Sequence, residues 1–369
     1  MGAGVLHDEL TAIATAHDID KVGVCSADVF TDVRAALHER KAAGLSADMQ
    51  FTYRNPDRAT DPRRSLPDAE TIVVCARSYR RAAPETEPAS AGNAAIAEYV
   101  WEPHYAELRT GLDAIAAHLR EAGWSSRVLM DDNALVDRAA AYRAGIGWWG
   151  KNSNILVPGI GSKFVLGSVV TNAPLPVVDE PLADQCGPCR RCIDACPTNA
   201  IVADGVIDSN RCLAWLVQSA GVFPPEFREA LGDRIYGCDD CQTACPPNVV
   251  SERKDVPEPT RGTTTAAVSE LLTLDDDALL ERFGAWYIPR REPRYLRRNA
   301  LIILGNTADA GAPEVRELVE RYVASDDEIE RAHAIWAASQ LGYADIVARC
   351  QDDENELVRA ELELIGSNP

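Results

Sequence analysis

The chain has 369 residues, of which 46% are hydrophobic and 25% charged, values typical of a globular protein with two or three domains. Its net charge of −20 argues against a broad nucleic-acid-binding surface, because phosphate contacts require clustered Lys and Arg. The sequence contains neither a run of about eighteen apolar residues nor a signal-peptide-like N-terminus. We therefore expect a cytoplasmic protein that does not enter the membrane and acts as a monomer.

Helices and strands alternate through residues 1–180. Apolar periodicity and helix-ending glycines predict helices at 7–18, 33–44, 104–123 and 136–145, and strands at 21–25, 69–79, 125–132 and 163–171. The intervening residues 80–95 are rich in Pro, Ala, Glu and Ser and are expected to form a surface loop. This order predicts an N-terminal α/β or α+β domain.

Two further domains are expected after residue 180. Residues 181–250 hold most of the cysteines and predict a ferredoxin-like domain, followed at 247–265 by a connector rich in Pro and charge. Residues 265–369 are predicted to be helical. Two similar segments, 298–309 and 331–345, are spaced about 35 residues apart, which favours HEAT-like helical repeats over a plain helical cap.

Eight cysteines lie in two runs and one isolated position. The first run, from Cys186 to Cys196, reads C-x2-C-x2-C-x3-C-P, and the second, from Cys238 to Cys245, reads C-x2-C-x3-C-P. Cys212 lies between them. A disulfide framework would suit a small secreted domain, and zinc would favour paired C-x2-C motifs in closed tetrahedral sites. The triplet of the first run instead predicts two [4Fe–4S] clusters.

The ferredoxin pattern also predicts how the cysteines divide. In bacterial ferredoxins, three close thiolates bind one cluster and the fourth reaches the other. One predicted cluster therefore takes Cys186, Cys189, Cys192 and Cys245, and the other takes Cys196, Cys212, Cys238 and Cys241. Cys25 and Cys75 lie in short apolar runs and are expected to be inert core thiols.

The segment "GIGWWG", residues 145–150, matches the spacing of a dinucleotide-binding fingerprint. That fingerprint must follow a strand and open a helix, whereas a predicted helix precedes this segment. We therefore expect a helix to end at Gly145, followed by a tight loop.

An acidic pair, Asp131 and Asp132, follows the predicted strand at 125–132. A carboxyl group in an apolar site retains its proton and can donate it. The alternative is that the pair caps the N-terminus of the next helix. The sequence leaves both roles open.

Five segments together resemble one family. They are "RATDPRRSLPDAETIVV", "MDDNALVDRAAAYRAGIGWWGKNSNIL", "CGPCRRCIDACPTNAI", "RIYGCDDCQTACPPN" and "LRRNALIILGN". The chain resembles the epoxyqueuosine reductases over nearly its whole length. The resemblance implies an oxidoreductase that converts epoxyqueuosine to queuosine in tRNA with a GUN anticodon. It also implies base-off cob(II)alamin reduced by the two clusters, and an external low-potential donor of the flavodoxin or ferredoxin type.

The resemblance assigns roles to individual residues. It implies that Asp131 is the proton donor above the corrinoid, with Asp132 as the near alternative. It places five further residues at the corrinoid: Arg58, Ser153, Ile155, Gln218 and Asp239. The chain departs from the family at Ser168, where Glu is usual, and in the run that follows Cys212.

Five arginines lie in the segment "PRREPRYLRRN". They are Arg290, Arg291, Arg294, Arg297 and Arg298, and they predict a phosphate-binding site for tRNA, with a solvated helix start as the alternative. Aromatic residues suitable for stacking unpaired bases are Trp286, Tyr287 and Tyr295.

Two other functions fit the same motifs. One is a corrinoid and iron–sulfur reductase of the same build that acts on a small or halogenated substrate. The other is a non-catalytic electron-transfer protein that reactivates a corrinoid, in which the acidic pair has only a capping role.

Overall fold

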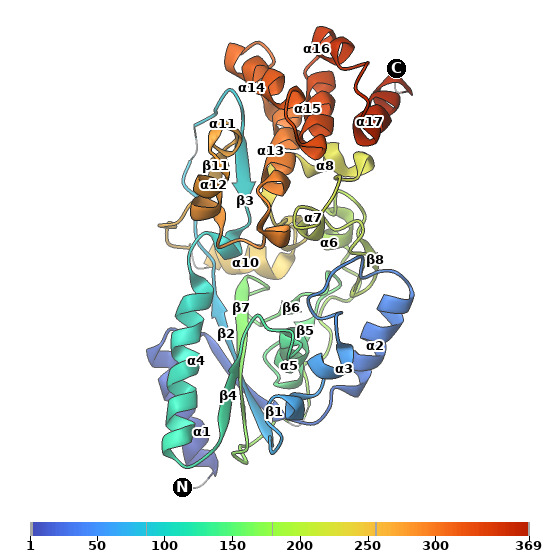
Figure 1. Cartoon of the computed structure of the whole chain (residues 1–369). Helices are drawn as coiled ribbons and strands as arrows, with labels where there is room; N and C mark the ends of the chain where they lie inside the picture. The colour runs from blue at the N-terminus through green and yellow to red at the C-terminus, as the bar shows by residue number, and fades with distance from the viewer. Residues whose placement is uncertain (1–2, 86, 179, 255–256, 368–369) are drawn as a thin grey trace. The chain divides into compact units, whose positions relative to one another are not determined.

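The computed structural model describes residues 3–85, 87–178, 180–254 and 257–367 (Figure 1). The chain forms two compact units from interleaved segments. Unit 1 comprises residues 1–82, 98–210 and 239–261, and unit 2 comprises residues 83–97, 211–238 and 262–369. The division into domains at 1–180, 181–250 and 265–369 stays a prediction. Within the described ranges, no helix has the length and apolar character needed to cross a membrane.

The centre of unit 1 is a four-stranded sheet in the order β1-β2-β7-β4, with every neighbouring pair antiparallel. Its strands are β1 (Lys21–Ser26), β2 (Thr71–Ser78), β4 (Ser126–Leu129) and β7 (Phe164–Thr171). An antiparallel sheet with helices packed on it is an α+β arrangement. Of the two predicted classes, α/β and α+β, unit 1 therefore has the second.

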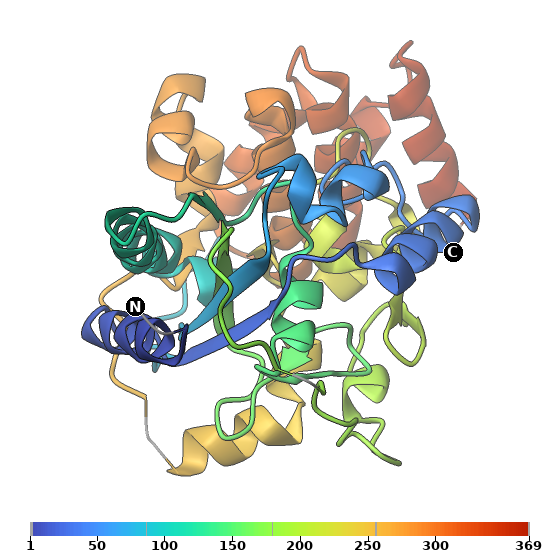
Figure 2. The same ribbon diagram turned by 90° about the horizontal axis from the view of Figure 1, so that it is seen from below.

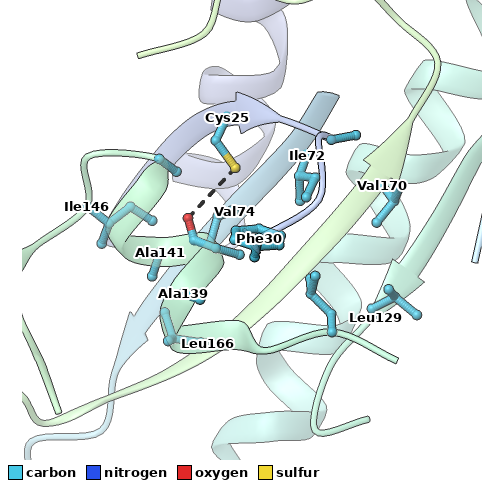
Figure 3. Packing of buried hydrophobic residues seen from close by; sticks show 14 of the residues in the cluster. Cys25, Phe30, Ile72, Val74, Leu129, Ala139, Ala141, Ile146, Leu166 and Val170 are labelled. Carbon is cyan, nitrogen blue, oxygen red and sulfur yellow. Dashed lines mark hydrogen bonds between the residues drawn. The ribbon is translucent and has the colours of Figure 1, made fainter. Parts of the chain in front are cut away.

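Helices cover both faces of this sheet. On one face, α1 (Ala3–Ala16) and α4 (His104–Glu121) pack against side chains that include Val73 and Val169 (Figures 1 and 2). On the other face, α5 (Asp137–Arg143) packs against Val74 and Val170 (Figure 3). Burial on both faces explains why β2 is a continuous apolar run rather than an alternating one.

Two cysteines belong to these cores, as predicted. The Cys25 thiol donates to the carbonyl oxygen of Ala140 at 3.8 Å. A dashed line marks this contact in Figure 3. Burial raises the pKa of both Cys25 and Cys75 to about 12. Neither thiol forms a reactive thiolate near neutral pH.

Short elements complete unit 1. Its shorter helices are α2 (Thr31–Ala42), α3 (Pro56–Ala59), η1 (Pro62–Arg64), η2 (Glu98–Val100), α6 (Arg191–Asp194), α9 (Asp240–Thr243) and α10 (Pro246–Lys254). Two hairpins pair β5 (Trp148–Trp149) with β6 (Ile155–Leu156), and β8 (Ile201–Ala203) with β9 (Val206–Ile207). The prediction that a connector begins at residue 247 was wrong, because α10 occupies Pro246–Lys254. This helix begins with two prolines, which the first helical turn tolerates.

Unit 2 contains a three-stranded sheet in the order β10-β3-β11. The central strand β3 (Asn93–Ile96) runs parallel to β10 (Arg234–Tyr236) and antiparallel to β11 (Thr265–Ala267). The loop predicted at 80–95 was therefore wrong at its end. Asn93–Ile96 is a strand because it pairs with segments distant in the sequence. Its own composition does not predict a strand.

Outside this sheet, the described elements of unit 2 are helices, and those after residue 267 agree with the helical prediction for residues 265–369. The helices are α7 (Leu213–Leu216), η3 (Pro225–Phe227), α8 (Arg228–Leu231), α11 (Val268–Thr273), α12 (Asp276–Phe283), η4 (Pro289–Arg291), α13 (Arg294–Thr307), α14 (Pro313–Val323), α15 (Glu328–Gln340), α16 (Ala344–Arg349) and α17 (Glu356–Ser367). A buried ion pair of 2.7 Å joins Arg228 in α8 to Glu361 in α17. The assignment of these helices to HEAT-like repeats stays a prediction.

Candidate active site and cluster ligands

Asp131 lies on the loop between β4 and α5. Its φ of +50° is in the left-handed region, which a non-glycine residue adopts at an energetic cost. Although Asp131 is exposed, partial desolvation by the surrounding protein raises the pKa of its carboxyl, and the neighbouring Asp132 carboxylate raises it further. A reachable carboxyl that retains its proton has the chemistry of a general acid.

A second carboxyl lies against Asp131. Asp137 is the first residue of α5 and lies within electrostatic reach of Asp131. Burial raises the pKa of Asp137 well above its ordinary value, and the charge of Asp131 raises it further. Its Oδ1 atom is buried without a hydrogen-bond partner in the described part of the chain. The charge of Asp131 therefore favours the protonated form of Asp137.

The acidic pair does not cap α5. The N-cap position is Val136, and no side chain caps this helix. Instead, Asp132 Oδ1 accepts a hydrogen bond of 2.8 Å from the N–H of Ala134 within the loop. The capping alternative considered from the sequence was therefore wrong, and the Asp131 carboxyl is left for another role.

Two hydrogen bonds anchor this loop to the preceding part of unit 1. The N–H of Val136 donates to the carbonyl of Ala59 at 3.0 Å, and Asn133 Oδ1 accepts from the N–H of Thr52 at 2.6 Å. Ala59 is the last residue of α3, which also carries the exposed Arg58. Helix α3 therefore both carries Arg58, which is predicted to bind the corrinoid, and contacts the loop that carries Asp131.

The segment "GIGWWG" is not a dinucleotide fingerprint. Helix α5 ends at Arg143, and Gly145, with φ of +68°, donates its N–H to the carbonyl of Tyr142 at 3.1 Å. A hairpin rather than a helix follows. The predicted helix end and tight loop are confirmed.

This hairpin carries two residues predicted to bind the corrinoid. Ser153 is half-buried on the turn with φ of +62°, and its N–H donates to the carbonyl of Gly150 at 2.9 Å. Ile155 is only 1% exposed, and its side chain packs in the core beneath α5 with Trp149. A ligand could therefore reach Ser153, but not the side chain of Ile155.

The opposite side of the hairpin faces cluster-binding cysteines. Trp148 and Leu156 pack in one apolar cluster with Cys245 and the partly buried Cys186. Burial raises the pKa of Cys245 to about 12, and the negative charges of Cys192, Cys186 and then Cys189 add to this increase. The four thiols predicted to share one cluster therefore lie within electrostatic reach of one another.

This grouping suits a four-iron cluster, in which each iron takes one thiolate. Among the residues that the structure describes, no three Cys, His, Asp or Glu side chains are arranged to hold a single metal ion. A cubane makes no such demand, because its thiolates bind separate irons.

The second predicted ligand set draws on both units. Cys196 and Cys241 belong to unit 1, while Cys212 and Cys238 belong to unit 2. Cys196 Sγ accepts a hydrogen bond of 3.2 Å from the N–H of Ala200. Asn152 Nδ2 donates to the carbonyl of Cys241 at 3.3 Å. This ligand set stays a prediction.

Gln218 and Asp239, the other two residues predicted to contact the corrinoid, form hydrogen bonds within the protein. Gln218, which follows α7, donates from Nε2 to the carbonyl of Ala214 at 2.8 Å. Asp239 Oδ2 accepts from the N–H of Glu98 at 2.9 Å, and its Oδ1 accepts from Gln242 Nε2 at 2.7 Å. Asp239 thus anchors the segment that carries Cys241.

Arg298 is not a surface residue. It is fully buried, and its guanidinium donates to the carbonyls of Ser219, Gly221 and Leu216 at 2.8, 2.7 and 3.1 Å. The prediction that it contacts tRNA was wrong, because those bonds hold the turn around Gln218 and leave the side chain inaccessible to a phosphate.

The other four arginines differ in accessibility. The side chain of Arg297 is 12% exposed and pairs with Asp276 at 2.6 Å, while that of Arg294 is 33% exposed and pairs with Asp327 at 3.0 Å. Arg290 and Arg291 are both exposed and both have left-handed backbones, with φ of +52° and +56°. Of the five arginines in this segment, Arg290 and Arg291 are therefore the most accessible to a polyanion.

The three aromatic residues predicted to stack on bases also differ in accessibility. Tyr287 is 56% exposed, whereas Tyr295 is buried. Trp286 stacks on Tyr236 with ring centroids 4.8 Å apart. Only Tyr287 has a largely free ring for stacking on a base.

Comparison with known proteins agrees with this architecture. Residues 185–248 match a family model described as a 4Fe-4S double cluster binding domain. An epoxyqueuosine reductase from Bacillus cereus is 34% identical over 346 residues, covering 91% of this chain and 89% of the relative. The chain belongs to the epoxyqueuosine reductase family.

Solved structures of epoxyqueuosine reductases have the same fold. One, crystallised with an epoxyqueuosine-modified tRNA-Tyr stem loop, aligns with a TM-score of 0.87 and 28% identity over 99% of this chain and all of that one. Another, from Bacillus subtilis, has its catalytic aspartate loop swung out of the active site. It aligns with a TM-score of 0.86 and 29% identity over 99% of both chains.

Two residues of this site were not identified from the epoxyqueuosine reductase motifs. Asp137 has only the sequence signal of an acid at the start of a helix, close to the Asp131 pair. Trp148 lies in the "GIGWWG" segment but has no sequence signal for contact with Cys186 and Cys245, which lie far from it along the chain.

Proposed function

We propose that this protein reduces epoxyqueuosine to queuosine in tRNA. Membership of the family supports this, as does a relative that aligns over the whole fold and was crystallised with an epoxyqueuosine-modified stem loop. The reaction breaks both C–O bonds of the epoxide, forms a C=C bond and releases the oxygen as water. It consumes two electrons and two protons, so the site requires a reductant and a proton donor.

Asp131 supplies a proton to the epoxide oxygen. The observation that carries this assignment is an exposed carboxyl with a raised pKa on a strained loop, in a chain that contains the family's motif. A B. subtilis relative of the same fold has a catalytic aspartate loop that swings out of its active site, which supports an aspartate on a mobile loop as the donor here.

The cluster-binding cysteines would hold two [4Fe–4S] clusters, which would supply electrons from a donor of the flavodoxin or ferredoxin type. A bound cobalamin would supply low-potential reducing chemistry at the epoxide. Arg58 is exposed and Ser153 lies on an accessible turn, so both can contact such a ligand. Since the Ile155 side chain is buried, only its backbone can do so.

The tRNA contacts the loop before α13. Arg290 and Arg291 supply charge, and the exposed Tyr287 ring supplies a stacking surface. A local patch of this kind is needed because the chain as a whole carries a net charge of −20.

The test compares two neighbouring acids. Anaerobically reconstituted, chemically reduced protein is incubated with an anticodon stem-loop RNA that carries epoxyqueuosine, and mass spectrometry follows loss of one oxygen from the nucleoside. Asp131→Asn should slow conversion by about 10²- to 10⁴-fold, the usual contribution of a general acid. Asp132→Asn should retain most of it.

Each outcome has a defined meaning. Failure of wild-type protein with full iron and corrinoid to convert the RNA would reject the proposed function. It would favour a reductase that acts on another substrate. Conversion by Asp131→Asn at the wild-type rate would reject Asp131 as the donor and leave the function standing.

A further inference from the structure

Trp148 contains an unpaired hydrogen-bond donor in the interior of unit 1. Its side chain is 5% exposed, and the buried indole Nε1 has no partner among the described residues. A buried N–H without an acceptor costs free energy, and such groups are rare in native proteins unless a ligand or another function accounts for them. This donor therefore requires an acceptor.

The apolar cluster around Trp148 includes two thiols. The indole packs with Leu156, Leu182, Cys186 and Cys245 in a single cluster. The only polar atoms among these side chains are the two thiol sulfurs. Both belong to the ligand set predicted for one [4Fe–4S] cluster.

Hairpin geometry fixes the direction of this side chain. Trp148 pairs with Leu156, and Trp149 pairs with Ile155. Adjacent strand residues point to opposite sides. Trp149 accordingly packs under α5 while Trp148 packs toward the cysteines. The two tryptophans thus provide a natural pair of test and control.

We propose that the indole N–H of Trp148 donates a hydrogen bond to a sulfur of the cluster bound by Cys186, Cys189, Cys192 and Cys245, and that it raises the reduction potential of that cluster. The proposal depends on the proposed function only for the presence of the clusters. Reduction adds negative charge to the sulfurs, so an N–H donor stabilises the reduced form more than the oxidised form. Trp148 thus influences electron transfer through the reduction potential of this cluster.

The experiment measures both cluster potentials. Trp148→Phe removes the N–H and keeps an aromatic ring, while Trp149→Phe makes the same change on the other side of the hairpin. Each protein is reconstituted, its iron is counted, and the reduced clusters are titrated by electron paramagnetic resonance. Trp148→Phe should lower the reduced-to-oxidised ratio of one cluster about tenfold at fixed potential, a shift of about 59 mV for one electron. Trp149→Phe should shift neither cluster.

Unchanged potentials in fully loaded Trp148→Phe would overturn the proposal, as would equal shifts in both variants. If Trp148→Phe does not retain its clusters, wild-type protein labelled with indole-¹⁵N tryptophan decides the matter. A nitrogen coupling to a reduced cluster is then expected, and its absence would overturn the proposal. Neither measurement requires RNA turnover, so failure to reduce epoxyqueuosine would reject the proposed function and leave this result intact.

Discussion

The carboxyl of Asp137, at the start of α5, lies within electrostatic reach of Asp131 on the exposed loop before it. Because burial and the charge of Asp131 raise the pKa of Asp137, folding favours its protonated form. The corresponding contribution to stability is fully present below the unfolded pKa and is lost as pH rises through the folded pKa.

Asp137→Asn should therefore raise the melting temperature near neutral pH, because Asn has a similar shape and remains uncharged in the buried site. Each unit by which the folded pKa exceeds the unfolded value corresponds to about 1.4 kcal/mol. Thermal unfolding followed from acid to neutral pH should show the gain shrinking toward about pH 4, where the wild-type carboxyl is protonated in both states. A lower melting temperature at neutral pH would contradict this account.

Asp132→Asn should change the pH dependence of turnover. The charge of Asp132 is the second cause of the raised pKa of Asp131, after desolvation. A general acid works only while protonated, so the rate falls as pH rises through its pKa. Removing the Asp132 charge lowers that pKa, and the alkaline limb of the kcat/KM profile should move to lower pH. A shift to higher pH, or none, would exclude this coupling.

Replacing Arg290 and Arg291 together by Ala should weaken binding of the modified stem loop and reduce its salt dependence. Each lost phosphate contact removes about 0.7–0.9 from the slope of log K against log salt. Arg316→Ala is the matched control, since Arg316 is a partly exposed arginine of α14 that pairs with Asp345. Identical slopes for the double variant and the control would remove this loop from the tRNA interface.

Gly161→Ala should destabilise unit 1 and lower its iron content. A Cβ at Gly161, whose φ is +87°, would lie 1.8 Å from Asn248 Oδ1, the atom that accepts the N–H of Ser162. Asn248 lies in α10 three residues after Cys245, so displacing it disturbs a cluster ligand. Overpacking of this kind costs about 1–3 kcal/mol.

Gly159→Ala provides the control for this clash. Gly159 has a similar φ of +79°, but an added Cβ there meets no atom within 4 Å. Urea unfolding and iron counting should show a larger loss for Gly161→Ala than for Gly159→Ala. Equal losses would mean that backbone strain alone is responsible.

The sequence predicts elements whose pattern is local. The apolar run of β2 and the amphipathic helix α4 are examples, and both lie within a few residues of their predicted ends. It misses β3, because Asn93–Ile96 is a strand only through pairing with β10 and β11. The hairpin of β5 and β6 has two residues per strand, too few to show a period.

The candidate site shows the same limit. Spacing alone groups Cys186 with Cys189 and Cys192, and the ferredoxin pattern adds Cys245, in agreement with the electrostatic contact among these thiols. By contrast, five arginines look alike in sequence, and only the packing separates the buried Arg298 from the exposed Arg290. The partner of Asp131 and the unpaired N–H of Trp148 depend on burial, which composition does not reveal.

The central position of β3 in its sheet has a consequence for biosynthesis. This strand leaves the ribosome before either neighbour exists, and it gains its second partner only when Thr265–Ala267 has been made. Until then its backbone groups remain open to pairing with other nascent chains. N-terminal fragments that keep residues 83–97 should therefore aggregate, whereas fragments that join residue 82 directly to residue 98 should be easier to produce.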